Sequence, residues 1–206
     1  MLLGAMTMSA ADYTHSVGVN VGSQYGVSYK GFIFGVDGLA LQVDLGVRLE
    51  QTAGSSTSKY DSDTYKGKIK DAPMYTFEAN PNVLYQKEFY TFDGGSLSWY
   101  TGGGLSLGLM GQLGKAQIKG DDEDSEWGSG KWITDEEGKE TVYGKFGVNA
   151  VAGLELNFSN APLALSFDFR PGYGLGFWNK KVDDVKRSET INFFDWSIAV
   201  GLRYRL

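Results

Sequence analysis

The clearest pattern in the chain is a strict alternation of apolar with small or charged residues at its C-terminal end. Over residues 194–206 the apolar positions are Phe194, Trp196, Ile198, Val200, Leu202, Tyr204 and Leu206. The positions between them hold Asp195, Ser197, Ala199, Gly201, Arg203 and Arg205. Alternation of this kind indicates a β-strand, because successive side chains leave opposite faces. Its length and its uncharged apolar face are typical of a membrane-spanning barrel strand, which needs about 9 to 11 residues.

Seven further segments alternate in the same way, and together with the last one they predict eight strands. Their approximate ranges are 13–22, 25–34, 39–51, 74–89, 96–113, 143–158 and 163–177. Pro81 and Pro171 fall inside two of these segments. Since proline cannot donate to a strand ladder, we expect each to mark a β-bulge or an exposed stretch of edge.

The connectors between these segments alternate between short and long. Turn-like connectors occupy residues 35–38, 93–95 and 159–162, whereas the long ones occupy 52–73, 114–142 and 178–192. On the long side, only the first connector, near residues 23–24, is short. Outer-membrane barrels separate short periplasmic turns from long extracellular loops in this way. The chain is therefore predicted to be all-β, an eight-stranded antiparallel up-and-down transmembrane β-barrel.

Aromatic residues gather near both ends of the predicted strands, and aliphatic residues fill the middle. Membrane barrels carry such aromatic girdles at the two interfaces of the bilayer. Tyr143 also lies near a long-loop end and is expected to belong to the girdle on that side. The main girdle residues are predicted to be Tyr75, Phe77, Tyr85, Trp99, Phe146, Phe158, Trp178, Phe194, Trp196 and Tyr204.

The opposite faces of the strands would line the lumen. The acids assigned there are Asp44, Glu50, Glu78, Glu155, Asp168 and Asp195, and the bases are Lys30, Arg48, Arg170, Arg203 and Arg205. An eight-stranded barrel has room for side chains and little else. Because unpaired buried charges are costly, we expect ion pairs across the lumen to close any pore. The alternative is that these charges form a pathway for protons or ions.

The composition of the chain limits the kinds of binding or catalytic site that it can form. The chain has 206 residues, enough for one domain, with no cysteine and one histidine. Disulfides, thiolate metal sites and a histidine-built metal cluster are therefore excluded, and we expect no metal and no cofactor. No run of 18 apolar residues occurs, so no transmembrane helix is predicted. The net charge of −6 argues against nucleic acid as a partner.

Residues 1–11 are small and apolar and end in Ser9, Ala10 and Ala11. An apolar core followed by small residues resembles the second half of a secretory signal peptide. We therefore expect residues 1–11 to be a residual signal segment and residues 12–206 to form a single barrel domain.

The long connector 114–142 is strongly acidic, and its acids include Asp121, Asp122, Glu123 and Asp124. Carboxylates can bind divalent cations, but EF-hand spacing is absent, and a charged, solvated loop is the preferred interpretation. Trp127 and Trp132 in this connector are candidates for contact with a glycan or a protein, or for packing within the loop.

Several segments carry a family resemblance. They are YGVSYKGF (25–32), ALQVDLGVRL (40–49), LSWYTGGGLSLG (97–108), GKFGVNAVAGLEL (144–156), PLALSFDFRPGYG (162–174) and FDWSIAVGLRYRL (194–206). They resemble small outer-membrane β-barrel proteins common in Bacteroidetes, within the porin-like and OmpA-like eight-stranded barrels. The resemblance implies the outer membrane of a Gram-negative bacterium, although the chain ends in Leu206 where many relatives end in phenylalanine.

The expected function is structural or one of surface interaction through the long extracellular loops, or that of an accessory subunit in an outer-membrane complex. The partners would be outer-membrane lipid and a protein or glycan at the loops, and we expect a monomer that is not an enzyme. One alternative is a narrow porin-like channel for small solutes. Another is a lipid-modifying enzyme using His15 beside Ser16. A soluble lipocalin-like barrel would require the apolar faces to point inward.

Overall fold

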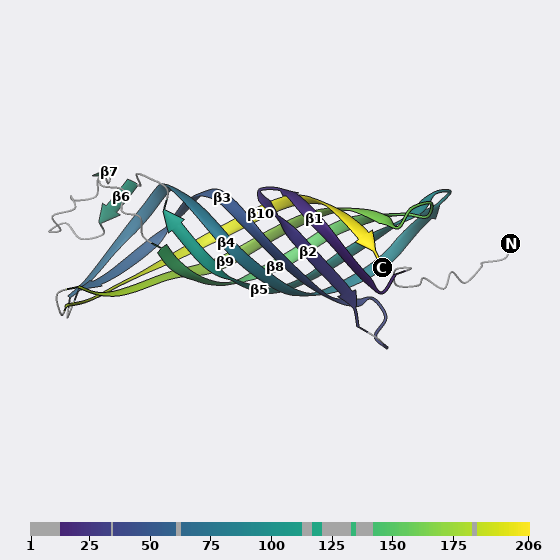
Figure 1. Cartoon of the computed structure of the whole chain (residues 1–206). Helices are drawn as coiled ribbons and strands as arrows, with labels where there is room; N and C mark the ends of the chain where they lie inside the picture. The colour runs from purple at the N-terminus through teal and green to yellow at the C-terminus, as the bar shows by residue number, and fades with distance from the viewer. Residues whose placement is uncertain are drawn as a thin grey trace.

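The structure is a closed barrel of antiparallel strands (Figure 1). The computed structural model describes residues 13–33, 35–60, 63–112, 117–120, 133–134, 142–182 and 185–206. Within that part of the chain, no helix is long and apolar enough to cross a membrane. The strands are β1 (His15–Gly22), β2 (Gln24–Phe32), β3 (Leu39–Tyr60), β4 (Asp63–Phe92), β5 (Gly95–Gln112), β6 (Gln117–Gly120), β7 (Ile133–Thr134), β8 (Val142–Phe158), β9 (Leu163–Val182) and β10 (Val185–Arg205).

Eight of these strands form the ring, and each pairs with its neighbours along the chain. β1 to β5 pair in sequence, β5 pairs with β8, and β8, β9 and β10 follow. The ring closes where β10 pairs with β1, with Tyr204 opposite Val17 and Val200 opposite Val21. The eight-stranded up-and-down barrel predicted from the sequence is thereby confirmed.

The β2–β3, β4–β5 and β8–β9 turns and both described termini lie at one end of the barrel, and the short β1–β2 turn lies on the other side (Figure 1). The β2–β3 turn contains Gly35 and Gly38 with φ angles of 81° and 72°, and the β4–β5 turn contains Gly94 with φ of 110°. Glycine adopts these left-handed conformations without the steric cost of a Cβ atom. The turn residues thus allow each pair of strands to reverse direction within a few residues.

Two of the three long connectors, which were predicted to be loops, are largely β-strand. β3 and β4 continue as a paired hairpin beyond residue 51, with Lys59 opposite Thr64. β9 and β10 do the same, with Lys181 opposite Lys186. The sequence pattern missed these extensions because ladder hydrogen bonds need no apolar face once the strands leave the bilayer.

The third long connector contributes the two short strands outside the ring. β6 pairs with the extension of β4, where Lys119 lies opposite Lys68, and β7 pairs with β6. Asp121, Asp122, Glu123 and Asp124 lie outside the described residues, as do residues 1–11.

The two prolines were expected to mark either a bulge or an exposed stretch of edge, and neither produces a bulge. Each lies instead where one ladder is interrupted, since the β4–β5 pairs omit Asn80 and Pro81 and the β8–β9 pairs omit Arg170 and Pro171. The β4–β5 ladder has the same register on both sides of Pro81, and the β8–β9 ladder keeps its register past Pro171. The register shifts lie instead between Thr52 and Gly54 and between Glu88 and Tyr90. A long barrel strand tolerates a missing donor because the flanking residues hold its register on both sides.

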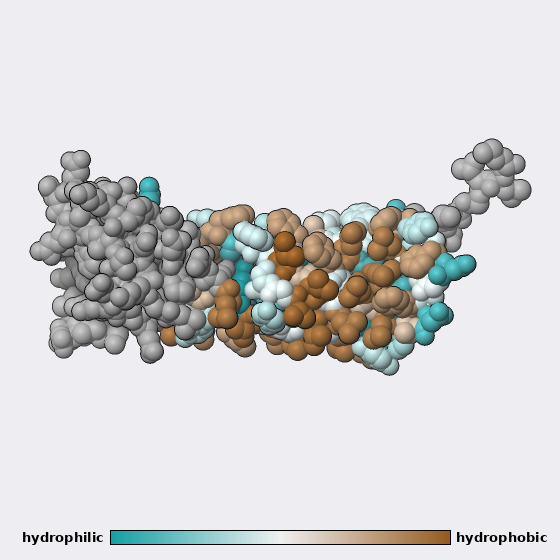
Figure 2. All heavy atoms as spheres, turned by 90° about the horizontal axis from the view of Figure 1, so that it is seen from above, coloured by the Kyte–Doolittle hydropathy of each residue, from teal (hydrophilic) through white to brown (hydrophobic). Residues whose placement is uncertain are grey.

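The outer surface of the ring is apolar. Hydrophobic side chains form a broad belt on the visible face of the barrel, and hydrophilic residues appear at the short-turn end (Figure 2). The exposed valine, leucine and aromatic side chains come from every ring strand, such as Val19, Leu45, Phe167 and Val200. A contiguous apolar patch of this extent is uncommon on a soluble protein and is the surface that a membrane-spanning barrel presents to lipid.

Glycines of β5 give its neighbours room to pack. A Cβ atom added at Gly104 would meet the Pro81 carbonyl oxygen and the Asn82 backbone, whereas at Gly176 in β9 the nearest atom would be 3.6 Å away. We therefore expect Gly104→Ala to lower the free energy of unfolding by about 1–3 kcal/mol through overpacking. Guanidinium titrations of the refolded barrel, followed by tryptophan fluorescence, would measure this change. The matched control is Gly176→Ala, and an equal loss in both variants would contradict the packing argument.

Candidate functional site

The lumen is the most distinctive feature of the molecule, because charged side chains fill it in layers. Alternation turns the polar residues of each ring strand inward, and many of them are fully buried. The charged side chains form three layers along the barrel axis, and an apolar cluster lies beyond them at the loop end. Each layer joins strands that lie on different sides of the ring.

The layer nearest the short turns is centred on Glu155 of β8. Its carboxylate accepts hydrogen bonds from Lys30 Nζ at 2.5 Å, Tyr13 Oη at 2.6 Å and Gln86 Nε2 at 2.8 Å. Arg203 Nε lies 3.8 Å away on β10. Both members of the Lys30–Glu155 pair are fully inaccessible to solvent. We call this set the Glu155 layer.

Aromatic rings complete the short-turn end. The Lys30 ammonium lies 5.0 Å from the ring centroid of Tyr100 and 5.8 Å from those of Tyr13 and Phe32. Such contacts stabilise a desolvated cation through the ring quadrupole. Burial, and then the nearby Glu155 carboxylate, raise the pKa of Tyr13 well above its usual value. Tyr13 therefore remains a phenol that donates to Glu155 and closes the base of the lumen.

The middle layer joins β3 to β9. Arg170 Nη1 binds Asp44 Oδ2 at 2.8 Å, and its Nη2 binds Asp168. Asp168 also accepts a hydrogen bond from the Tyr100 hydroxyl, and Asp44 accepts one from Asn20 Nδ2 at 3.0 Å. Both carboxylates thus have a cationic partner and a neutral donor, which is the arrangement that offsets the cost of burial.

The layer on the loop side, which we call the Arg48 layer, is a square of two acids and two bases. Arg48 Nη2 lies 3.0 Å from Glu78 and 2.8 Å from Asp195, and Lys145 Nζ lies 2.7 Å and 2.9 Å from the same two carboxylates. Lys145 was missing from the sequence-based lumen set. The sequence pattern could have identified it, because Lys145 is separated by an even number of positions from Asn149 and Glu155, which also point inward from β8.

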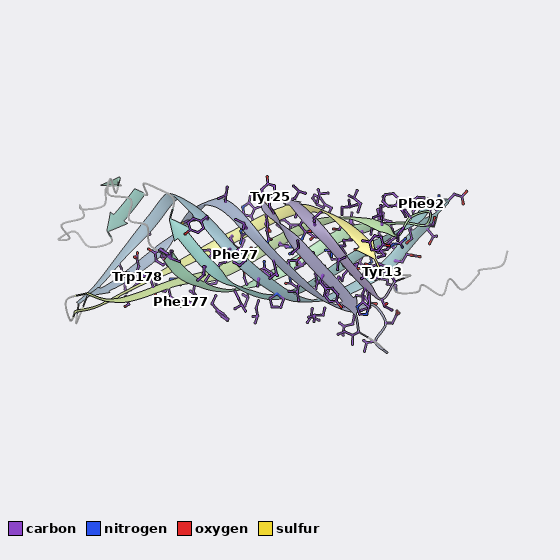
Figure 3. All side chains as sticks on the ribbon, viewed as in Figure 1. Tyr13, Tyr25, Phe77, Phe92, Phe177 and Trp178 are labelled. Atoms are coloured by element: carbon purple, nitrogen blue, oxygen red, sulfur yellow. The ribbon has the colours of Figure 1, made fainter. Side chains whose placement is uncertain are left out.

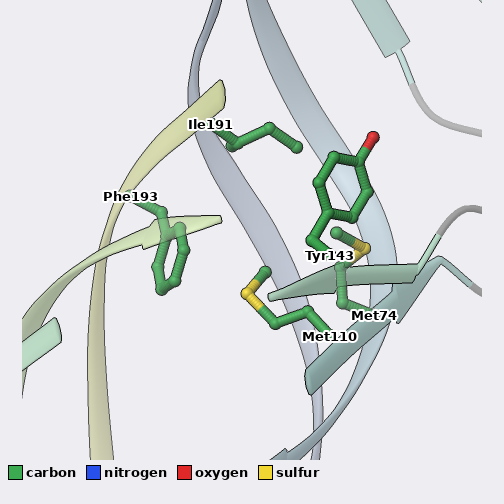
Figure 4. Packing of buried hydrophobic residues seen from close by; sticks show 5 residues of the cluster. All are labelled: Met74, Met110, Tyr143, Ile191 and Phe193. Atoms are coloured by element: carbon green, nitrogen blue, oxygen red, sulfur yellow. The ribbon is translucent and has the colours of Figure 1, made fainter. Parts of the chain in front are cut away.

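Beyond the Arg48 layer the lumen is closed by apolar side chains, which we call the plug (Figure 4). Its buried members are Met74, Met110, Tyr143, Ile191 and Phe193, and Trp178 packs against them. The Lys145 ammonium lies 5.3 Å from the centre of the Phe193 ring, which joins the plug to the charged layer below.

The prediction that Tyr143 and Trp178 belong to the girdle was wrong, because both pack in the plug and not on the lipid-facing surface. The prediction used only their position along the strand axis. Whether a residue faces the lipid or the lumen depends instead on its odd or even position in the alternation. The outward neighbours are Phe177 and Phe146. Figure 3 labels Phe177 and Trp178 near the loop end of β9.

The other predicted girdle residues lie on the outer surface. Phe77, Tyr85, Trp99, Phe146, Phe194, Trp196 and Tyr204 are exposed, and Tyr75 and Phe158 are partly exposed. Tyr85 and Trp99 are in ring contact, with centroids 5.8 Å apart.

Three residues that were singled out in the sequence remain to be placed, namely Arg205, Glu50 and His15. Arg205 donates to the backbone carbonyls of Phe158 and Ala161 and so ties the last strand to the β8–β9 turn. The side chain of Glu50 lies outside the described set. His15 Nδ1 is 2.8 Å from the Tyr29 hydroxyl on the outer surface. Among the described residues, no group of three or more metal-binding side chains could hold an ion.

Comparisons with known proteins give similar folds and no family. No protein-family model matches the chain, and no curated protein matches it. Similar solved structures include Neisserial surface protein A, which is 16% identical, with 93% of this chain and 94% of that chain covered and a TM-score of 0.34. Another is Ail, the attachment invasion locus protein of Yersinia pestis, which is 15% identical, with 93% and 97% covered and a TM-score of 0.28. Ail was also solved in complex with the heparin analogue sucrose octasulfate. The barrel assigned to this chain follows from its own strand pairing.

Proposed function

We propose that this protein is an integral barrel of the outer membrane of a Gram-negative bacterium and that its lumen does not conduct. It would act at the cell surface through the extended β3–β4 and β9–β10 hairpins and the connector that carries β6 and β7. A protein or a glycan would be the partner there. The observation that carries this proposal is the filled lumen.

Each described level of the lumen argues against a pore. In the Glu155 layer, both charged partners are inaccessible to solvent. In the Arg48 layer, each carboxylate contacts two cations. A permeating ion would have to break these buried pairs and displace the plug, and removing a partner from a buried pair costs several kcal/mol. This supports a structural or surface-interaction role over the narrow channel.

Planar-bilayer recording tests the closed lumen. We expect the purified, folded protein to show no steady conductance above that of the bilayer alone. The matched comparison is a variant whose plug is reduced, Phe193→Ala with Ile191→Ala, which leaves the charged layers in place and should also remain closed. Stable single-channel steps from the unaltered protein would contradict the proposal and favour the porin-like alternative.

A further inference from the structure

The outer belt has a groove over the seam where the barrel closes. The groove has a volume of about 520 Å³ and lies across β1, β2, β3 and β10. That volume is within the range of small-molecule sites, which is about 300–1,000 Å³. Its floor is formed by the short outward side chains of Val17 and Val19 on β1. Tyr29 of β2 and Tyr204 of β10 are both paired with Val17 and form the two side walls.

The part of the groove farther from the short turns is aliphatic. One row of paired residues crosses it, with Leu45 opposite Val27, Val27 opposite Val19 and Val19 opposite Leu202. All four side chains are exposed. A hydrocarbon chain makes dispersion contacts along such a surface and has no polar group that needs a partner. This part of the groove therefore suits an acyl chain.

A polar pair lies at the other end of the groove, where β1 begins near the short turns (Figure 1). His15 is exposed there, and its Nδ1 lies 2.8 Å from the hydroxyl of Tyr29. The two rings stack, with centroids 6.0 Å apart. Gly31 leaves room for this contact, because a Cβ atom there would lie 2.9 Å from Tyr29 Oη and 3.0 Å from His15 Nδ1. The outer surface thus carries a hydrogen-bonding pair next to an apolar groove.

The His15–Tyr29 pair keeps one proton that it can donate. A neutral imidazole carries one N–H and tyrosine one O–H, and the hydrogen bond between them uses one of the two. When Tyr29 donates to Nδ1, the second proton is on His15 Nε2, and when Nδ1 donates, it is on the Tyr29 hydroxyl. In both arrangements the pair offers a donor. A phosphodiester is an anionic acceptor, and its hydrogen bonds are about twice as strong as those between neutral groups.

We propose that this groove binds one phospholipid of the periplasmic leaflet. One acyl chain packs along Val17 and Val19 between the two tyrosine rings, and the phosphate accepts a hydrogen bond from the His15–Tyr29 pair. The polar end of the groove lies toward the short turns and the aliphatic part toward the middle of the barrel, which is the order of head group and acyl chain in that leaflet. The periplasmic leaflet of an outer membrane is composed of phospholipid. The proposal rests on the membrane location proposed above and is independent of the closed lumen.

Native mass spectrometry of the barrel in a mild detergent tests the site. The probe is an equimolar mixture of phosphatidylethanolamine, phosphatidylglycerol and diacylglycerol with the same acyl chains. We expect the unaltered protein to retain one molecule of either phospholipid in preference to diacylglycerol, which lacks the phosphate. Val17→Trp fills the groove and should abolish this retention. Val148→Trp is the matched control, since Val148 lies on β8 outside the groove and is 52% exposed against 45% for Val17.

A second variant tests the contact with the phosphate. The double substitution His15→Phe with Tyr29→Phe keeps both rings and removes the polar atoms of the pair. It should lower the preference for phospholipid over diacylglycerol by about tenfold, a usual effect of losing one hydrogen bond to a charged group. The control is Tyr85→Phe, which removes a hydroxyl from the same girdle outside the groove and should leave the preference unchanged.

The membrane location is tested separately, by the need for detergent during extraction and by gel mobility before and after boiling, which also establishes that each variant is folded. A folded barrel that needs detergent but retains no phospholipid would overturn the groove site alone. Equal retention of diacylglycerol by the unaltered protein, unchanged retention by Val17→Trp, or loss of phospholipid by either control would overturn it as well.

Discussion

Replacing Glu155 with glutamine is expected to lower the free energy of unfolding by about 3–5 kcal/mol, the cost of leaving a buried charge without its partner. The Glu155 carboxylate accepts hydrogen bonds from Lys30, Gln86 and Tyr13. Glutamine keeps the shape but carries no charge to match the inaccessible ammonium of Lys30. Guanidinium unfolding of the barrel in phospholipid vesicles, read by tryptophan fluorescence, measures the change.

The control for this experiment is Glu88→Gln. Glu88 accepts one exposed hydrogen bond, from Thr91 Oγ1 at 2.8 Å. Its substitution should change the free energy by less than about 0.5 kcal/mol, as is usual for surface positions. A loss for Glu155→Gln no larger than that of the control would show that the layer contributes little to stability.

A charge introduced on the outer belt should be nearly as damaging. We expect Val200→Arg to destabilise the barrel in vesicles by about 2–4 kcal/mol, because its guanidinium would have to be placed near the middle of the hydrocarbon. Val36→Arg is the matched control, since Val36 lies in the β2–β3 turn and is 49% exposed against 45% for Val200. The control should lose no more than about 1 kcal/mol, as at a membrane interface.

The same titration in vesicles distinguishes the two positions. Similar values for Val200→Arg and Val36→Arg would mean that the belt is not in contact with lipid. That outcome would contradict the membrane-spanning interpretation of the barrel surface, because Val200 lies in the middle of the proposed membrane-spanning part of β10 and Val36 lies in the β2–β3 turn outside it.

Alternation predicted which face of each strand points outward wherever it was applied strictly. Val19, Leu45 and Val200 lie on the belt as the period of two requires. Trp178 and Tyr143 were misplaced because their height along the strand was used without their parity. Lys145 was overlooked for the same reason, although its position on β8 directs it into the lumen. The inward direction of all three side chains could therefore have been predicted from the sequence pattern.

The ends of the strands were less predictable. An apolar period disappears where the strands leave the bilayer, so residues 52–60 and 185–192 were predicted to be loop. The structure pairs these two segments with each other, with Ile191 opposite Ser56. That pairing depends on β1 and β2 being short, and no local pattern in β3 or β10 records where a neighbouring hairpin ends.

The amino-acid sequence by itself determined the strand number, the direction of each face and the side of the barrel on which the turns lie. These properties follow from local periodicity and turn chemistry, which every segment carries on its own. Only the tertiary structure decided which charges meet, such as Arg48 with Asp195, because these partners are 147 positions apart. Their contact depends on the register of every strand around the ring. The plug likewise exists only after closure, since its members come from β4, β5, β8 and β10.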